Sequence, residues 1–440
     1  MALEIWILVF YKNKKFDDII KKSFDFNKLD RRDKSFLFLL INTCMRRHKQ
    51  AQKIYNEYAR FGIKKKNRYL NGILVIATIQ LIWLEIAPYA VLNEAVNQAK
   101  FYIGDKQSKL VNAILRNMLA NKDDWLSLIP EDKYNLPEWL LNSWISSYGE
   151  KNVDEIATIA MEPPPLDIVV SNKMKKSELE QLKLNLSGEQ ILPNVIRCNL
   201  NEPVESLPRF SDGIWWIQDV ASQIPCNLLL SKIKQHFSKS INSIKVIDMC
   251  CAPGGKTAQL LNNELDVVSI EKSKLRSHNF KENMKRLNFN SNLINANAEN
   301  YMPNFKADVI LIDAPCSATG TIRKNPDIFI KPAPTNLDDL ILTQDNILNN
   351  ASKILNKNGL IMYVTCSLQK IEGERRMEKF LKKNQNFSVV PFISSDYPMI
   401  NDCITEEGFV RILPNYFKFN SDDVMNGSDG FFVSLVKMEN

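Results

Sequence analysis

The chain has 440 residues, of which 45% are hydrophobic and 24% charged, a composition typical of a folded protein of two or three domains that excludes a disordered chain. Its longest apolar run, 73–86, contains Thr78, Gln80 and Glu85 and is too short to cross a bilayer core of about 30 Å. The N-terminus lacks the features of a secretory signal, so we expect a cytoplasmic protein without a membrane partner.

The cysteines do not form a recognisable metal or disulfide pattern. Eight cysteines are scattered along the chain without a Cys-x-x-Cys pair, and the three histidines do not complete a cluster with them. Structural zinc sites and disulfide frameworks need such spacings, so we expect neither. A given cysteine is then an ordinary core residue unless its local context indicates chemistry.

Positive charge is concentrated near the N-terminus. The net charge is +7, but residues 1–70 alone hold 18 Lys and Arg against 7 Asp and Glu, which leaves the rest of the chain slightly acidic. A basic excess suits a polyanion, because each phosphate contact releases counterions and adds affinity. Charge alone does not distinguish an RNA-binding surface from an ordinary solvated helix face.

The N-terminal third is expected to be helical. From residue 28 to 118, apolar residues recur at helical spacing with few breakers. A helix should begin at Pro88, and a turn is expected around Gly104. We predict an all-α domain over residues 1–130. Residues 131–235 mix helical and strand-like segments around three prolines at 163–165, which predicts a small α+β connector.

Strands and helices alternate from Ile244 onward. The expected strands are KVIDMC, DVVSIE, NLINAN, ADVILID and GLIMYVT, and several are apolar without alternation, as in strands buried on both faces. This βαβα order predicts a Rossmann-like α/β domain over residues 236–440, with a parallel sheet and helices on both faces. Ligands of such sheets bind beyond the carboxyl ends of the strands.

The first of these strands runs into the glycine-rich sequence Asp248-Met249-Cys250-Cys251-Ala252-Pro253-Gly254-Gly255-Lys256-Thr257. Its end imitates a phosphate-binding loop, but that motif needs glycine at position 250. The next strand ends at Glu271, where a carboxylate can accept hydrogen bonds from both ribose hydroxyls of an adenosine. Hydride chemistry would require G-x-G-x-x-G, which is missing, so S-adenosylmethionine is the cofactor that we predict.

Two later strand ends carry reactive groups, Asp313 and Cys316 on one and Cys366 on the next. We expect these groups to converge beside the cofactor. A thiolate that adds to carbon 6 of cytosine activates carbon 5 for methylation, and a carboxylate can bind the base as its charge shifts. Methylation of an exocyclic amine would favour an Asn/Asp-Pro-Pro-aromatic strand end, whereas here Ala314-Pro315-Cys316 follows Asp313. The competing interpretation is that both cysteines are inert core thiols.

These motifs resemble those of the RNA 5-methylcytosine methyltransferases of the NOL1/NOP2/Sun group over nearly the whole chain. The resemblance rests on DMCCAPGGKT, LIDAPCSATGTIRKNPDI, YVTCSL, GFVRILP and DGFF, with IWWIQDVASQIP in the connector. The segments ATIQLIWLEIAPYAVLNEAV and LVNAILRN resemble a NusB-like RNA-binding domain. The resemblance therefore implies a class I S-adenosylmethionine methyltransferase domain, an all-α NusB-like N-terminal domain and a small α+β connector.

The resemblance also implies roles for individual residues. It makes Cys366 the nucleophile, with Cys316 and Asp313 as further catalytic residues. The residues implied to bind the cofactor are Cys250, Cys251, Ala252, Pro253, Gly254, Gly255, Lys256, Glu271, Arg276, Asn297 and Asp313. The chain departs from the family in having Asn297 where Asp is usual, and LDIVVSN lacks the arginine of the family's LRVN.

The NusB-like half favours 16S rRNA as the substrate, with no DNA partner and a monomeric enzyme. The alternatives are a cytosine methyltransferase of tRNA or 23S rRNA, and a non-catalytic RNA-binding assembly protein that retains only the fold. The intact cysteines, glycines and Asp313 argue against the non-catalytic alternative.

Overall fold

The computed structural model describes residues 1–440 except 61, 65, 201, 335, 420–424 and 440. The chain forms two compact units, one of Met1–Glu162 with Lys324–Ala333 and one of Pro163–Arg323 with Pro334–Asn440. The division into three parts at residues 130 and 235 stays a prediction. Within the described residues, no helix is long and apolar enough to span a bilayer.

The first unit is helical, as the apolar spacing predicts, and its helices begin well before residue 28. They are α1 (Ala2–Lys12), α2 (Phe16–Lys22), α3 (Phe24–Lys28), α4 (Arg31–Glu57), α5 (Arg68–Ile82), α6 (Pro88–Ile103), α7 (Asp105–Ala120), α8 (Trp125–Leu128), α9 (Glu138–Tyr148) and α10 (Glu150–Ala160). Gly104 separates α6 from α7 with a φ of 87°. Gly72 lets α1 pack closely on α5, since a Cβ there would lie 2.7 Å from Trp6.

A distant piece of chain completes this helical unit. Residues 324–333 contain the short helix η7 (Pro326–Phe329), which packs against α4. Trp139 of α9 donates its indole N–H to the carbonyl of Lys331 at 3.1 Å. In the sequence, residues 324–333 follow the strand end that carries Cys316, which belongs to the second unit. The sequence therefore did not predict that these residues pack in the helical unit.

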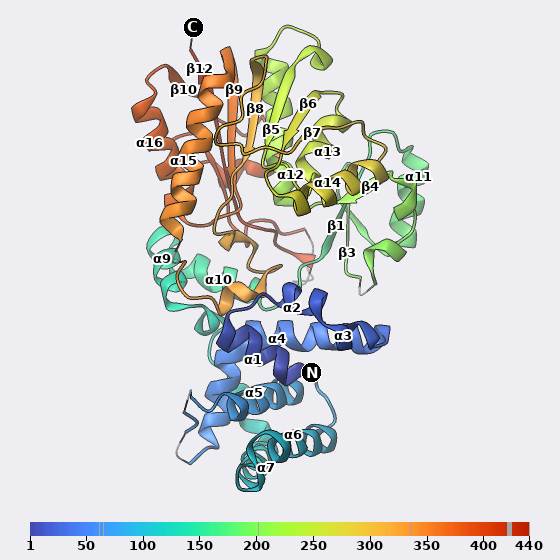
Figure 1. The fold of residues 1–440 in the computed structure, drawn as a ribbon, viewed down its shortest axis with the longest axis vertical. Helices are drawn as coiled ribbons and strands as arrows, with labels where there is room; N and C mark the ends of the chain where they lie inside the picture. Colours follow the sequence, from blue (N-terminus) through green and yellow to red (C-terminus); the bar gives the residue numbers. More distant parts are fainter. Residues whose placement is uncertain (61, 65, 201, 335, 420–424, 440) are drawn as a thin grey trace. The chain divides into compact units, whose positions relative to one another are not determined.

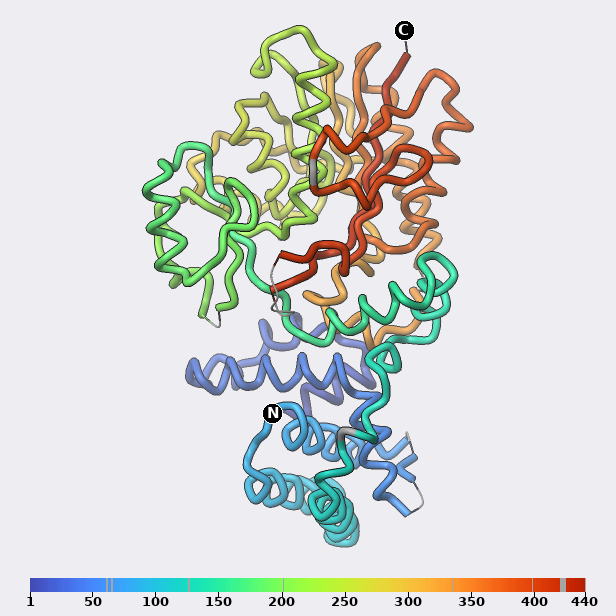
Figure 2. The backbone as a smooth tube through the Cα atoms, turned by 180° about the vertical axis from the view of Figure 1, so that it is seen from behind, coloured from blue at the N-terminus to red at the C-terminus, as the bar shows by residue number. Residues whose placement is uncertain are grey.

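The second unit contains a small antiparallel sheet with the strand order β2-β3-β1-β4. Its elements are β1 (Leu166–Val170), α11 (Lys176–Asn185), β2 (Glu189–Leu192), β3 (Val195–Cys198) and β4 (Trp215–Ile217). Its core includes Ile168, Ile196 and Trp215, all fully buried. Figure 2 shows this small green layer from behind.

The main sheet of the second unit has the order β10-β12-β9-β8-β5-β6-β7, with β11 paired to β12. Its strands are β5 (Lys245–Met249), β6 (Asp266–Ile270), β7 (Asn292–Ile294), β8 (Ala307–Asp313), β9 (Leu355–Thr365), β10 (Phe387–Val389), β11 (Val410–Ile412) and β12 (Phe431–Met438). Its helices are α12 (Val220–His236), α13 (Gly255–Asn262), α14 (Lys274–Arg286), α15 (Leu337–Ile354) and α16 (Glu374–Lys383).

Apolar side chains of the main sheet are buried on both faces, as the unbroken apolar strands predict. Val246 and Val309 pack in one core with residues of α12, whereas Ile247 and Ile310 pack in another with residues of α15. Helices therefore cover both faces (Figure 1). This fold confirms the expected Rossmann-like class.

The five strands expected from the sequence form a parallel sheet, as predicted, but the structure adds three C-terminal strands that were not expected. Strands β5 to β9 are parallel, but β12 runs antiparallel to β9, β10 and β11. Strand β12 lies between β9 and β10 and pairs with both, so β10 does not pair with β9. The apolar run Phe431–Val436 is buried and suits this position, but strand direction is set by pairing with distant chain rather than by local pattern.

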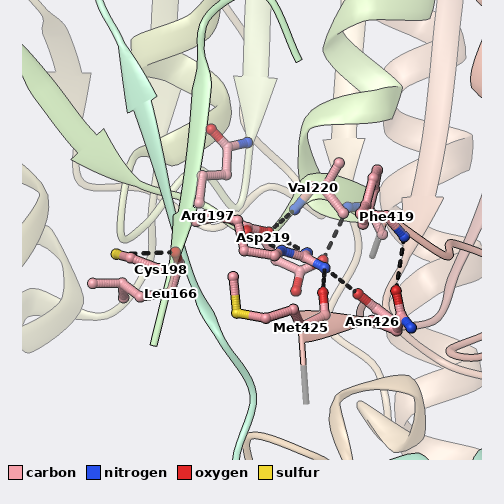
Figure 3. A network of polar contacts seen from close by, with 12 residues as sticks. Leu166, Arg197, Cys198, Asp219, Val220, Phe419, Met425 and Asn426 are labelled. Carbon is pink, nitrogen blue, oxygen red and sulfur yellow. Dashed lines mark hydrogen bonds and ion pairs between the residues drawn. The ribbon is translucent and has the colours of Figure 1, made fainter. Parts of the chain in front are cut away.

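A buried ion pair within the small sheet is also hydrogen-bonded to the C-terminal segment of the same unit. The guanidinium of Arg197 donates to both carboxylate oxygens of Asp167, at 2.6 and 2.8 Å, and to the carbonyls of Met425 and Gly427. The carboxylate of Asp219 accepts from the backbone N–H of Asp429 at 3.1 Å. Figure 3 shows this network between the strands and the C-terminal segment.

Candidate active site

The glycine-rich turn lies between β5 and α13. Cys250 and Gly254 have φ angles of 63° and 109°, and Gly254 is the residue that precedes the first turn of α13. A Cβ on Gly254 would lie 2.8 Å from the Cε of Met284, so only glycine fits without movement. No side chain caps α13, so the N–H groups of its first turn are suited to a polar ligand.

Glu271 lies beside this turn, directly after β6, and is 2% exposed. Its Oε1 accepts from the backbone N–H of Ser273 at 2.8 Å. Its Oε2 has no hydrogen-bond partner among the described residues, although Nη1 of Arg276 is 3.3 Å away. A buried carboxylate oxygen without a hydrogen bond costs free energy, so this position fits a ligand hydroxyl such as that of a ribose. Ser273 caps α14 by accepting from the backbone N–H of Arg276.

Arg276 and Asn297 flank Glu271. The guanidinium of Arg276 donates to the carbonyl of Ala252 in the glycine-rich turn. Asn297 follows β7, the strand next to β6, and its side chain exchanges hydrogen bonds of 3.2 Å with Glu299. Arg276 thus contacts both the turn and Glu271, and Asn297 follows the end of the neighbouring strand.

Lys256, which is buried, and Asp313, which is partly exposed, form an ion pair in the same region. The Nζ of Lys256 lies 2.8 Å from Oδ2 of Asp313, the last residue of β8, and 3.4 Å from the hydroxyl of Ser222. Burial disfavours the charge on Lys256, but Asp313 outweighs burial and raises the pKa of the amine above its usual value. Lys256 therefore stays a cation, and its charge also acts on Cys366.

The two cysteines meet at neighbouring strand ends. Strands β8 and β9 pair in parallel up to Asp313 and Val364, and the sulfur atoms of Cys316 and Cys366 are 3.5 Å apart. The hydrogen bond to Cys366 is the main reason, ahead of burial, that the pKa of Cys316 lies well above its usual value. Cys316 therefore holds its proton more tightly than a free thiol does, and either sulfur of the pair could donate the hydrogen bond between them.

The structure adds residues to this site that sequence reasoning missed. Asp248 is fully buried and bonds to the hydroxyl of Thr257 at 2.5 Å, and burial raises the pKa of its carboxyl to about 7. Glu372 is fully buried and contacts both cysteine-bearing loops. The repeated Cys-Ser dipeptide at the two strand ends was the available signal, because Ser317 and Ser367 are the residues that bind Glu372.

We expect Glu271→Ala to weaken the binding of S-adenosylmethionine by about 1–3 kcal/mol, since it leaves ligand hydroxyls without their buried acceptor. Calorimetric titration of the purified protein with the cofactor measures this change. Glu282→Ala, which removes an exposed carboxylate of α14, is the matched control and should bind as the wild type does. Unchanged affinity in Glu271→Ala would mean that the cofactor binds elsewhere.

The turn after the first parallel strand, the buried acid after the second and the Rossmann-like sheet together define a class I S-adenosylmethionine-dependent methyltransferase. The model of the family described as 16S rRNA methyltransferase RsmB/F matches residues 239–437, and that of the NusB family matches residues 2–120. The chain therefore belongs to the RsmB/F family of methyltransferases and carries a NusB-like N-terminal domain.

Individual relatives support this assignment. The chain is 30% identical over 383 residues to the ribosomal RNA small subunit methyltransferase B of Photorhabdus laumondii, across 84% of this chain and 82% of the relative. It is 24% identical to the probable enzyme of the same name from Synechocystis sp., across 96% and 95%. The family confirms that the protein is an enzyme and that S-adenosylmethionine is its cofactor.

Solved structures support the fold alone. The crystal structure of NSun6 from Pyrococcus horikoshii with SFG aligns with a TM-score of 0.57 at 18% identity, covering 70% of this chain and 99% of that one. The crystal structure of PH0851 aligns with a TM-score of 0.71 at 19% identity, covering 100% and 97%.

Proposed function

We propose that the protein methylates carbon 5 of a cytosine in 16S rRNA, of the type at position 967, through a covalent adduct with Cys366. The observation that carries this proposal is the pair of sulfur atoms 3.5 Å apart beside the Lys256–Asp313 ion pair. Methylation of rRNA is the activity that the relatives' names record. The distinctive requirement of carbon 5 chemistry is a thiolate nucleophile with a second group able to move a proton.

Cys366 is suited to attack. The charge of Lys256 acts on Cys366, and a nearby cation favours a thiolate over a thiol. The sulfur of Cys316 lies 3.5 Å from that of Cys366, within reach of a hydrogen bond. The thiolate adds to carbon 6 of cytosine, which breaks the 5,6 double bond and makes carbon 5 nucleophilic. S-adenosylmethionine supplies the electrophilic methyl group. Asp313, partly exposed at the end of β8, would bind the amine edge of the base.

Cys316 is suited to the second stage. Once Cys366 has become a thioether it carries no negative charge, so it no longer opposes the ionisation of Cys316. The Cys316 thiolate can then take the proton from carbon 5, and the C–H electron pair re-forms the 5,6 double bond and expels Cys366 as a thiolate. The two thiols thus exchange protonation states between the two stages.

The proposed cofactor site follows the strand ends. The buried oxygen of Glu271 would accept the ribose hydroxyls, and Arg276 would steady this carboxylate against the turn. The other residues proposed to contact the cofactor are Cys250, Cys251, Ala252, Pro253, Gly254, Gly255, Lys256, Asn297 and Asp313. Asn297 keeps a hydrogen-bonding side chain without the charge that an aspartate would have.

The substrate assignment rests on the helical part of the chain. Its basic N-terminal stretch supplies charge for the RNA backbone, and the NusB-like match favours 16S rRNA over tRNA or 23S rRNA. A monomeric cytoplasmic enzyme without DNA or membrane partners remains part of the proposal. The non-catalytic alternative is set aside by the enzyme family and by the paired cysteines.

Bisulfite sequencing of RNA from cells with and without the gene tests the proposal, because 5-methylcytosine resists conversion. We expect one cytosine of 16S rRNA to lose protection in the deletion strain and to regain it with the wild-type gene. A gene encoding Cys366→Ala should fail to restore protection. Loss of protection in tRNA or 23S rRNA instead would favour the alternative substrates, and no change at any cytosine would contradict carbon 5 methylation.

A further inference from the structure

The carboxylate of Glu372 is held between the two loops that carry the cysteines. Glu372 ends the short helix η8 (Lys370–Glu372) and is fully buried. Its Oε1 accepts from the backbone N–H of Ser317 at 2.9 Å and from the side-chain amide of Gln344 at 3.1 Å. Its Oε2 accepts from the hydroxyls of Ser317 and Ser367. An ionised carboxylate only accepts hydrogen bonds, and these partners are able to donate.

These contacts fix the residues on either side of the reactive sulfurs. Ser317 follows Cys316 and Ser367 follows Cys366, so one carboxylate binds the neighbour of each cysteine. Gln344 of α15 also donates to the carbonyl of Pro315 at 2.9 Å, which holds the Cys316 loop from its other side. Glu372 thus joins the two loops through their side chains, in addition to the backbone hydrogen bond from Gly320 to the carbonyl of Cys366.

The charges around the sulfur pair are asymmetric. The charge of the Glu372 carboxylate is tied more closely to the Cys316 loop, because among the described residues two of the four hydrogen bonds that it accepts come from Ser317 and one comes from Ser367. This charge acts on Cys316 and disfavours its thiolate. The cation of Lys256 acts on Cys366 instead. A carboxylate tied more closely to the Cys316 loop than to the Cys366 loop therefore favours the proton on Cys316.

We propose that Glu372 is a positioning residue that clamps both cysteine loops and directs the proton of the thiol pair to Cys316, so that Cys366 is the sulfur that attacks. The proposal rests on the proposed function, because it assigns the roles of the two cysteines in that reaction. Glu372 acts through the cysteines and does not itself contact the base.

Glu372→Gln tests the charge while preserving the shape of the side chain. The purified protein without RNA is treated with limiting iodoacetamide between pH 6 and pH 9, and mass spectrometry measures the alkylation rate of each cysteine. Thiolates react and thiols do not. We expect Cys366 to react well ahead of Cys316 in the wild type, and Glu372→Gln to reduce this preference about tenfold, the equivalent of one unit in relative pKa. Glu378→Gln, an exposed neighbour on α16, should retain the full preference.

Two further readouts separate positioning from a general loss of structure. Glu372→Gln should lower kcat for methylation more than it raises KM for RNA, and Glu372→Asp, which keeps the charge, should restore the preference for Cys366. Unchanged preference in a folded Glu372→Gln would overturn the proposal. If Glu372→Gln does not fold, equal reactivity of the two thiols in Glu372→Asp would overturn it. Because alkylation needs no RNA, it tests Glu372 even if the wild type methylates another position.

Discussion

Cys366→Ala should abolish methylation and form no covalent complex with RNA, whereas Cys316→Ala should leave the enzyme attached to its substrate. Without the Cys366 sulfur, no thiolate can reach carbon 6, and the reaction cannot begin. Without the Cys316 sulfur, the attack and the methyl transfer still proceed, but the group that takes the carbon 5 proton is missing. The expected losses in turnover are large, because removing a nucleophile or its proton acceptor typically costs at least a hundredfold.

A denaturing gel of each variant with substrate RNA and cofactor measures the adduct directly, since a covalent complex migrates slowly. The double variant Cys316→Ala with Cys366→Ala is the control, because the adduct of the single Cys316 variant should disappear when Cys366 is also removed. An adduct that appears with Cys366→Ala and not with Cys316→Ala would reverse the two roles. The sulfur distance of 3.5 Å is compatible with that reversal, so the experiment is decisive.

Arg197→Met should reduce the free energy of unfolding by about 3–5 kcal/mol, the usual cost of removing one partner of a buried ion pair. The variant leaves the carboxylate of Asp167 buried without its guanidinium and releases the carbonyls of Met425 and Gly427 (Figure 3). Burial already raises the pKa of Asp167 even beside Arg197, and the variant should raise it further. Asp167 then takes up a proton more readily on folding. The variant should therefore lose less of its free energy of unfolding at pH 5 than at pH 8.

Urea unfolding at the two pH values measures this effect. Arg209→Met is the matched control, because Arg209 also pairs with carboxylates, those of Glu178 and Asp212, but is partly exposed. Pairs of that kind contribute about 1 kcal/mol or less. If Arg197→Met cost no more than Arg209→Met at pH 8, the buried network would not stabilise the fold.

The sequence predicted the helices of the first unit and the residues at the strand ends. Apolar spacing located the helices of the first unit, and strand ends located Cys316, Cys366 and Glu271, because the carboxyl ends of parallel strands meet at one edge. The antiparallel course of β12 and the role of Glu372 were not predictable in this way. Both depend on pairing between residues far apart in sequence, for which hydrophobic pattern and turn residues carry no signal.

The packing of residues 324–333 in the helical unit limits which parts of this enzyme can be exchanged in a chimaera. This peptide continues from the loop of Cys316, yet its short helix η7 packs against α4. The carbonyl of Lys331 in the same peptide accepts a hydrogen bond from Trp139. Exchange of the N-terminal half for another RNA-binding module would leave this peptide without the surface on which it folds. A chimaera that keeps α4 and α9 together with residues 324–333 should therefore fold better than one that replaces all of the N-terminal helices.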